Sequence, residues 1–278
     1  MDKFEKIFKT RNPIIGVLHF MPLLGYEGYP GIDKILENAL YDLQVLEQNG
    51  VDGVIVENNY DVPHKIKVGP ETVAAMTLLT SEIIKRTRLP IGVSVLWNDY
   101  EAALSIAKVC GGKFIRIPVF VDEVETNYGQ VLGSPKPVVS FQNKIDAKDI
   151  LLLTDIHVKH AKILSKDSIE KSAKKAIENG SGALVVTGKW TADAPNVDDL
   201  EKVRSSVGDF PIIVGSGADQ ENIKLLLEYV DGVIVSTSLK TGNNDQRLVN
   251  IKNYDQRIDA AKTRNFVDKF KISAKKST

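Results

Sequence analysis

Short apolar runs alternate with amphipathic stretches along most of the chain. Unbroken apolar runs such as 13–20 (PIIGVLHF) and 52–58 (DGVIVEN) predict strands that are buried on both faces. Between them, apolar residues recur at helical spacing, as at Ile35, Ala39 and Leu43. Strict alternation of this kind predicts parallel strands joined by crossover helices.

The pattern predicts eight strands and a closed barrel. The predicted strands are 13–20, 52–58, 90–97, 113–120, 150–161, 182–190, 211–219 and 231–242. The main predicted helices are 32–49, 70–87, 101–110, 168–179, 197–207, 220–229 and 256–270. Eight such units in 278 residues fit an α/β fold with a single (β/α)8 TIM barrel better than an open sheet. No GxGxxG follows the first strand, which weighs against a dinucleotide-binding fold.

Three segments depart from the alternation, and we treat residues 1–278 as one domain. Residues 1–12 place Phe4 and Phe8 at helical spacing, so we expect a short helix that closes the bottom of the barrel. Residues 121–148 are irregular, and we expect a long functional loop and a degraded helix there. The polar residues 271–278 predict a mobile tail.

Composition limits the class of protein. Lys plus Arg and Asp plus Glu both number 36, so no global field favours nucleic acid or an anionic membrane. No apolar run is long enough to span a bilayer, and residues 1–12 do not resemble a signal peptide. Cys110 is the one cysteine, which fits a reducing compartment. We expect a cytoplasmic protein and, by analogy with other barrels, a homo-oligomer.

Polar residues gather where the predicted strands end, and in a parallel barrel these ends meet at the face that carries the active site. The stretch 150–161 is the clearest case, since its apolar run ends in Asp155, His157, Lys159 and His160. Because side chains alternate along a strand, Asp155 and His157 are expected to point together into the barrel mouth. The other candidates at strand ends include His19, Glu57, Asn58, Arg116 and Thr187.

The cluster of Asp155, His157 and His160 has three interpretations. We favour acid–base catalysis, with Asp155 orienting His157. A divalent metal site is the second, in which His157, His160, His19 and Glu57 converge. In the third, the histidines only satisfy hydrogen bonds at the end of the barrel. We expect no cofactor beyond that metal alternative.

Two further groups suggest binding of an anion. The loops after the seventh and eighth strands contain Gly215, Ser216, Gly217, Ser236 and Thr237, residues that suit a phosphate site built from backbone N–H groups. The alternative is that they form tight turns. Arg116 lies among apolar residues and requires either a barrel acid or an anionic substrate.

A lysine at a strand end also permits covalent chemistry. Lys189, which follows the sixth strand, could form a Schiff base with a carbonyl compound. We favour the alternative that Lys189 is a solvated loop lysine.

Several segments together resemble the BtpA family. They are PIIGVLHFMPLLG, DGVIVEN, FIRIPVF, TDIHVKHA, VVTGKWTADAP, IIVGSGADQENI and DGVIVSTSLKTG. The resemblance spans about Pro13 to Gly242 and implies a TIM barrel of the ribulose-phosphate-binding type. The family motifs include the candidate residues at the strand ends, which are His19, Glu57, Asn58, Arg116, Asp155, His157, His160 and Thr187. They also include Gly215, Ser216 and Gly217 after the seventh strand, and they add Gly188 and Lys240 as candidates. One departure is visible at Thr191-Ala192. The family pattern has Thr-Gly followed by a proline there, whereas this chain has Ala192 in the place of the glycine and its proline at Pro195.

Two functions remain as hypotheses. The first is an enzyme of the isomerase, lyase or nucleosidase type that acts on a phosphorylated sugar or nucleotide-like molecule, with Asn58, Arg116, Thr187 and Lys240 as substrate-binding residues. The second is a non-catalytic factor for biogenesis or assembly of a membrane protein complex. The family's best-described role, in photosystem I biogenesis, implies this second function, and 121–148 would supply the partner surface.

Overall fold

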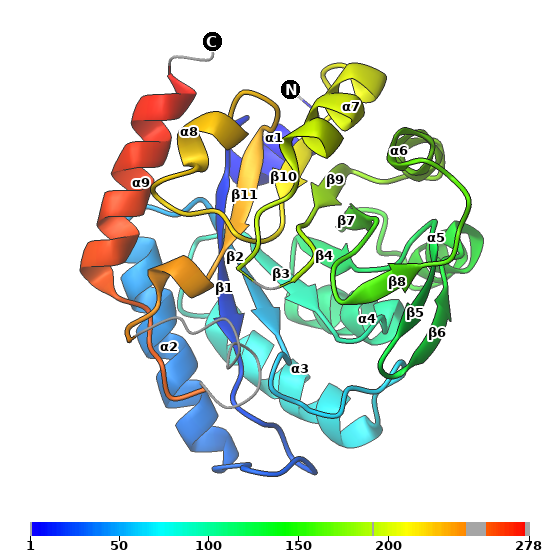
Figure 1. Cartoon of the computed structure of the whole chain (residues 1–278). Coiled ribbons are helices and arrows are strands. Elements are labelled where there is room, and N and C mark those ends of the chain that lie inside the picture. Colours follow the sequence, from blue (N-terminus) through cyan, green and yellow to red (C-terminus); the bar gives the residue numbers. More distant parts are fainter. Residues whose placement is uncertain (1, 191, 243–253, 276–278) are drawn as a thin grey trace.

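The computed structural model describes residues 2–190, 192–242 and 254–275. Eight parallel strands close into a barrel in the ring order β1-β11-β10-β9-β7-β4-β3-β2 (Figure 1). These strands are β1 (Ile14–His19), β2 (Gly53–Glu57), β3 (Ile91–Ser94), β4 (Phe114–Ile117), β7 (Leu151–Ile156), β9 (Ala183–Val186), β10 (Ile212–Val214) and β11 (Gly232–Val235). The (β/α)8 barrel predicted from the sequence is confirmed.

Helices surround the barrel and connect its strands (Figure 1). They are α1 (Lys3–Phe8), α2 (Ile32–Gln48), α3 (Pro70–Ile84), α4 (Tyr100–Cys110), α5 (Pro135–Lys144), α6 (Ile169–Glu178), α7 (Val197–Val207), α8 (Ile223–Leu226) and α9 (Ala260–Ala274), with the 3-10 helix η1 (Thr237–Leu239). The predicted mobile tail is partly wrong, because Lys271–Ala274 continue α9 and Ser273 is buried. Residues 276–278 lie outside the described residues.

The bottom of the barrel is closed by α1. Its aromatic residues Phe4 and Phe8 belong to the same apolar cluster as inward-facing strand residues such as Ile15 and Leu153. The Phe8 ring lies 5.2 Å from the ring of Phe114 on β4. Residues 3–8 therefore form the closing helix expected from the helical spacing of the aromatic residues.

The segment 121–148 is more regular than expected. It forms a hairpin of β5 (Glu123–Thr126) and β6 (Gly129–Leu132), followed by α5. The third strand of this small antiparallel sheet is β8 (Ala161–Ile163), which pairs with β5 beside the barrel (Figure 1). The prediction of a long loop was wrong, because β5 pairs with its neighbour β6 and also with β8, which is distant in sequence.

The predicted strand 150–161 is likewise two strands. It stays in the barrel as β7 only to Ile156, and β8 begins at Ala161. Between them the backbone takes left-handed conformations at His157 (φ 48°) and His160 (φ 59°). These two turns redirect the chain from the barrel to the small sheet, and they end the side-chain alternation that the strand pattern predicted.

Candidate active site

The carboxyl ends of the barrel strands bring six ionisable side chains together, and we call this group the mouth cluster. Its members are His19, Glu57, Arg116, Asp155, Lys159 and Lys240. The first four continue the inward-facing rows of Val17, Ile55, Phe114 and Leu153, whose side chains fill the barrel interior below them. Period-two alternation on each strand therefore places these ionisable groups above the apolar core.

Arg116 and Asp155 form a buried bidentate ion pair across β4 and β7. Arg116 donates from Nε to Asp155 Oδ1 at 2.9 Å and from Nη2 to Oδ2 at 2.7 Å. The residues are 8% and 1% exposed. Burial alone lowers the pKa of Arg116, but Asp155 and Glu57 together outweigh it and raise that pKa. A barrel acid is therefore the primary partner of Arg116, which decides between the two alternatives left open by the sequence.

His19, Glu57 and Lys240 form a second group beside this pair. The Lys240 ammonium donates to His19 Nδ1 at 3.1 Å and to the Tyr60 hydroxyl at 3.2 Å. His19 Nε2 lies 3.5 Å from Glu57 Oε1. Burial, and then the charge of Lys240, hold the pKa of His19 well below its ordinary value. The network thus assigns a neutral His19 whose Nε2–H faces Glu57.

The two groups are joined through Glu57. Its Oε2 lies 4.0 Å from Arg116 Nη1, so charged and polar side chains run from Asp155 to Tyr60 across the mouth. Burial lowers the pKa of Lys240 to about 8, against the opposing effect of the carboxylates Asp42 and Glu57. Tyr60 was not among the candidates from the sequence, because it follows β2 in an irregular loop and only the fold places its hydroxyl on Lys240.

Lys159 is the main site residue that the sequence reasoning missed. It lies in the loop after β7, where its N–H donates to Thr187 Oγ1 at 2.9 Å. Burial lowers the pKa of its amine to about 8, with Arg116 as a further cause and Glu57 and Asp155 opposing. Strand alternation could not have identified it, because β7 ends at Ile156 and the backbone turns at His157; the one signal in the sequence is the closeness of Lys159 to the strand end.

The predicted pairing of Asp155 with His157 is wrong. Both Asp155 oxygens accept from Arg116, and His157 Nε2 is buried without a hydrogen-bond partner among the described residues. The His157 N–H donates to Asp122 Oδ2, and the Ser172 hydroxyl of α6 donates to Asp122 Oδ1. Asp122 is bonded at both oxygens on the α6 side, so His157 is held there rather than beside Arg116. The left-handed backbone at His157 is the physical reason.

His160 and Thr187 line the edge of the mouth. The His160 N–H donates to the Lys189 carbonyl at 3.1 Å, and its ring lies 5.3 Å from that of Trp190. Burial, and then the charge of Lys159, lower the pKa of His160 to about 4. Thr187 holds the loop that carries Lys159. Lys189 is exposed, as the interpretation of a solvated loop lysine predicted.

Asn58 has a positioning role in this structure. Its Oδ1 accepts from the Leu96 N–H at 2.7 Å, and its Nδ2 donates to Asp61 Oδ2 at 3.2 Å. Asp61 in turn accepts from the Leu23 N–H, so Asn58 ties together the loops after three strands. Both ends of the amide are engaged by protein groups, which leaves Asn58 poorly placed for the predicted contact with substrate.

The loop after β10 retains free backbone donors. The N–H groups of Ser216, Gly217 and Ala218 form no hydrogen bond within the described chain. Just before them, a Cβ on Gly215 would lie 2.5 Å from Val185 Cγ1 and 3.4 Å from Arg116 Nη2, so Gly215 lets the chain pass close to β9 beside the guanidinium. The Ser216 hydroxyl is already used, since it accepts from the Gly188 N–H and donates to the Asp193 carbonyl. Backbone N–H groups, rather than the Ser216 side chain, are therefore available to an anion here.

The loop after β11 adds a hydroxyl without a partner. Ser236 is buried, and its Oγ has no hydrogen-bond partner among the described residues. It follows the inward-facing Ile234 on β11, so it continues the row that leads into the mouth. Thr237 begins η1 directly after it. The two loops thus supply donors of the kind that the sequence predicted for a phosphate.

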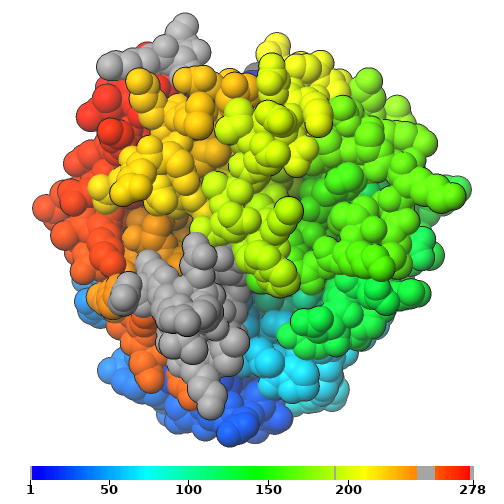
Figure 2. Space-filling model, viewed as in Figure 1, coloured from blue at the N-terminus to red at the C-terminus, as the bar shows by residue number. Residues whose placement is uncertain are grey.

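The chain after β9 packs against the loop after β10. A Cβ on Gly217 would lie 2.2 Å from the backbone nitrogen of Ala194, and Gly217 has a φ of 69°. Figure 2 shows this yellow-green part of the chain in the middle of the visible face, between α8 and the green segments. Ala192, which stands where the family pattern has a glycine, has a left-handed backbone with a φ of 64°. Thr191 lies outside the described residues.

Replacing Gly217 with Ala tests this packing. A left-handed residue that gains a Cβ is destabilised by about 1–2 kcal/mol, and the overlap with Ala194 adds about 1–3 kcal/mol. Gly111→Ala is the matched control, because its φ is 89° and nothing lies within 4 Å of an added Cβ. Urea unfolding should show the larger loss for the Gly217 variant. Equal losses would mean that the chain after β9 does not rest on Gly217.

The metal alternative receives no support from the geometry. Within residues 2–190, 192–242 and 254–275, no group of three or more His, Cys, Asp or Glu side chains is arranged to hold a metal ion. Of the four residues proposed to converge, only His19 and Glu57 approach one another.

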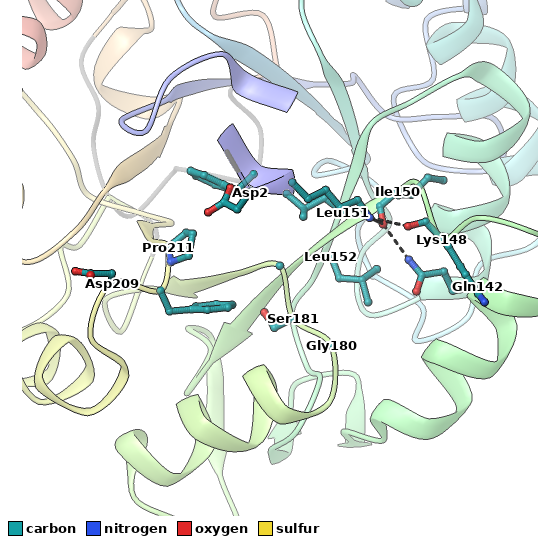
Figure 3. Close-up of a pocket in the computed structure, with 14 residues that line it drawn as sticks. Asp2, Gln142, Lys148, Ile150, Leu151, Leu152, Gly180, Ser181, Asp209 and Pro211 are labelled. Carbon is teal, nitrogen blue, oxygen red and sulfur yellow. Dashed lines mark hydrogen bonds between the residues drawn. The ribbon is translucent and has the colours of Figure 1, made fainter. Parts of the chain in front are cut away.

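A cavity of about 530 Å³ lies at the opposite end of the barrel, where the strands begin (Figure 3). Lys3 of α1 donates to the carbonyls of Lys148 and Ile150, and Gln142 also donates to Ile150. These contacts join α1 and α5 to the start of β7. In barrels of this kind the amino-terminal face serves stability, so we place the chemistry at the mouth.

In the part of the chain that the structure describes, no helix combines the length and apolar character needed to cross a membrane. This agrees with the absence of a long apolar run in the sequence.

Comparison with known proteins supports both the fold and the family. Orotidine 5′-phosphate decarboxylase from Pyrococcus horikoshii OT3 has a TM-score of 0.57 at 11% identity, covering 93% of this chain and 99% of that one. N-(5′-phosphoribosyl)anthranilate isomerase from Pyrococcus furiosus has a TM-score of 0.55 at 13% identity, covering 94% and 99%. At such identities the likeness concerns the fold alone, a closed barrel of eight parallel strands with helices between them.

The sequence itself has nearer relatives. The photosystem I biogenesis protein BtpA from Synechocystis is 36% identical over 247 residues, covering 88% of this chain and 85% of that protein. The model of the BtpA family matches residues 10–271. The chain therefore belongs to the BtpA family.

Proposed function

We propose that this protein is an enzyme that acts on a phosphorylated small molecule, of the sugar or nucleotide type, at the mouth cluster. The observation that carries the proposal is the charge of the cluster. With Lys159 and Lys240 protonated at pH 7 and His19 neutral, three cations face two carboxylates, which leaves one positive charge in excess. Ser216–Ala218 and Ser236, whose donors have no partner among the described residues, follow β10 and β11 at the same end of the barrel.

The phosphate has a defined place in this proposal. It accepts from the backbone N–H groups of Ser216–Ala218 and from the Ser236 hydroxyl, above the guanidinium of Arg116. Barrels commonly bind phosphate between the loops after their last two strands. Two proteins of the same fold act on compounds with a 5′-phosphate, as their names state.

The reacting part of the substrate then faces His19 and Glu57. A carboxylate beside a neutral imidazole can take a proton from one atom and return it to another, which is worth about 10²–10⁴-fold in rate. Asp155 does not take part directly, because both of its oxygens hold Arg116. This geometry replaces the Asp155 and His157 pair with His19 and Glu57 as the acid–base groups.

Thermal shift against paired compounds tests the phosphate site. Sugar phosphates and 5′-nucleotides are each compared with the same compound without phosphate. A ligand at a hundredfold excess over its Kd stabilises by about 2.7 kcal/mol, so we expect the Tm to rise by about 5–10 °C with at least one phosphorylated member. The dephosphorylated partner should give a clearly smaller rise.

Variants identify the residues on which the rise in Tm depends. Ser236→Ala should reduce the rise, since it removes a buried donor, and Lys240→Met should reduce it by removing a charge. Lys189→Met is the control, because Lys189 is an exposed lysine on a neighbouring loop. If no phosphorylated compound raises the Tm of the unmodified protein, the proposed function fails.

A non-catalytic role in assembly is the second candidate, and the name of the cyanobacterial relative is the observation that favours it. Glu57→Gln separates the two in a cell that depends on this protein. If the variant folds normally and still supports growth or assembly, the assembly role is favoured over catalysis.

A further inference from the structure

We propose that Lys159 forms an imine with the carbonyl carbon of a phosphorylated aldehyde or ketone, and that the mouth cluster then cleaves a bond next to that carbon. The inference rests on the proposed function and narrows it. It selects a lyase or isomerase that uses a carbonyl substrate and sets the nucleosidase alternative aside.

The position of Lys159 is the first support. Its backbone is fixed over the barrel by the bond to Thr187 Oγ1. Burial is the main cause of the lowered pKa of both His19 and His160, and the charge of Lys159 is a further cause for each. His19 ends β1 and His160 follows β7, four strands apart in the ring. The charge of Lys159 therefore acts on both edges of the mouth, in agreement with the place of Lys159 on the loop that Thr187 holds there.

The availability of the amine is the second support. Lys159 Nζ forms no hydrogen bond or ion pair with any described residue, although Arg116, Glu57 and Asp155 are close enough to change its pKa. Lys240 differs, because His19 and Tyr60 hold its amine. With a pKa of about 8, a substantial fraction of the Lys159 amine is neutral near physiological pH, as nucleophilic attack requires.

The neighbours of Lys159 supply the proton transfers. The neutral amine forms a C–N bond to the carbonyl carbon, and the carbonyl oxygen takes up protons and leaves as water. Overall, an ammonium and a carbonyl give a protonated imine and water. When a C–H or C–C bond next to the imine carbon breaks, its electron pair moves toward the imine nitrogen. Glu57 accepts the proton released, either from the C–H bond or, in C–C cleavage, from the hydroxyl group on the departing carbon, which leaves as an aldehyde or ketone. Glu57 returns a proton to the enamine carbon, and water then hydrolyses the imine to release the product and the Lys159 amine.

Trapping with a phosphorylated aldehyde tests the proposal. The protein is incubated with pyridoxal 5′-phosphate or, as a smaller probe, dihydroxyacetone phosphate, then reduced with borohydride, and the modified lysines are mapped by peptide mass spectrometry. Lys162 is the internal control, since it follows three residues later, its side chain is 75% exposed and it pairs with Glu125.

Lys159 should be modified selectively. A pKa of about 8 rather than 10.5 leaves about two orders of magnitude more neutral amine at pH 7. Lower basicity offsets part of this gain, so we expect at least ~10-fold preference over Lys162. Labelling of Lys159 should rise with pH to a midpoint near 8.

Variants distinguish the imine from simple binding. Lys159→Arg keeps the positive charge, so phosphorylated ligands should still raise its Tm while labelling at this position is lost and turnover falls. Lys162→Arg should behave as the unmodified protein. If phosphorylated compounds bind but both probes label lysines indiscriminately, the imine is refuted and the proposed function stands. If no phosphorylated compound binds, both fail.

Discussion

Replacing Asp155 with Ala is expected to lower the free energy of unfolding by about 3–5 kcal/mol, because it leaves the buried charge of Arg116 without its primary partner. Glu57 Oε2, 4.0 Å from Arg116 Nη1, can compensate only in part. The loss should appear as a lower midpoint in urea unfolding at pH 7, followed by circular dichroism.

Two controls define the cause of this loss. Asp149→Ala breaks the exposed ion pair with Lys108 and should change stability by only about 0–1 kcal/mol. The double variant Arg116→Met with Asp155→Leu removes both buried charges and should recover most of the stability. If Asp155→Ala unfolds at the same urea concentration as the unmodified protein, the pair is not what keeps Arg116 charged and buried.

Replacing Glu57 with Gln is expected to lower kcat/KM by about 10²–10⁴-fold, because the amide cannot accept the proton that the proposed chemistry releases. The substrate for this assay is the phosphorylated compound identified by thermal shift. Glu57 also raises the pKa of Lys159 and Lys240, so its loss lowers both values further. The rising limb of the pH–rate profile should therefore move to lower pH.

The matched control for this prediction is Glu125→Gln. Glu125 is half exposed on β5, where it pairs with Lys162 outside the mouth cluster. Its variant should retain full turnover and an unchanged pH profile. A Glu57→Gln enzyme that keeps turnover within about tenfold would exclude Glu57 as the acid–base group.

The candidate site was partly predictable. The position of Glu57 and Arg116 at the ends of predicted strands correctly placed them at the mouth, and alternation correctly placed Asp155 above the core, since parity is a local property of a strand. The partner of Asp155 was not predictable in the same way. His157 is close in sequence, yet Arg116, 39 residues earlier, occupies both oxygens. That outcome follows from the pairing of β4 with β7, which aligns Arg116 with Leu153.

The loop after β10 was also predictable only in part. The free N–H groups at Ser216–Ala218 agree with the phosphate loop expected from its glycines. The hydroxyl of Ser216, however, is consumed by Gly188 and Asp193, which come from the chain after β9. Lys240 was a candidate only through the family resemblance, and its contact with His19 spans 221 residues.

The sequence by itself determined the eightfold alternation, the closing helix at the bottom and the set of polar residues at the strand ends. Each of these depends on the periodicity of apolar residues within a short segment, and that periodicity can be read from residues that are neighbours in the sequence. The tertiary structure alone decided that β8 pairs with β5, that His157 turns toward α6 and that Thr187 holds the backbone of Lys159 at the mouth. Those outcomes depend on backbone turns and on the register between strands that are distant in sequence. The free energy of such a contact depends on both segments, so neither segment predicts it alone.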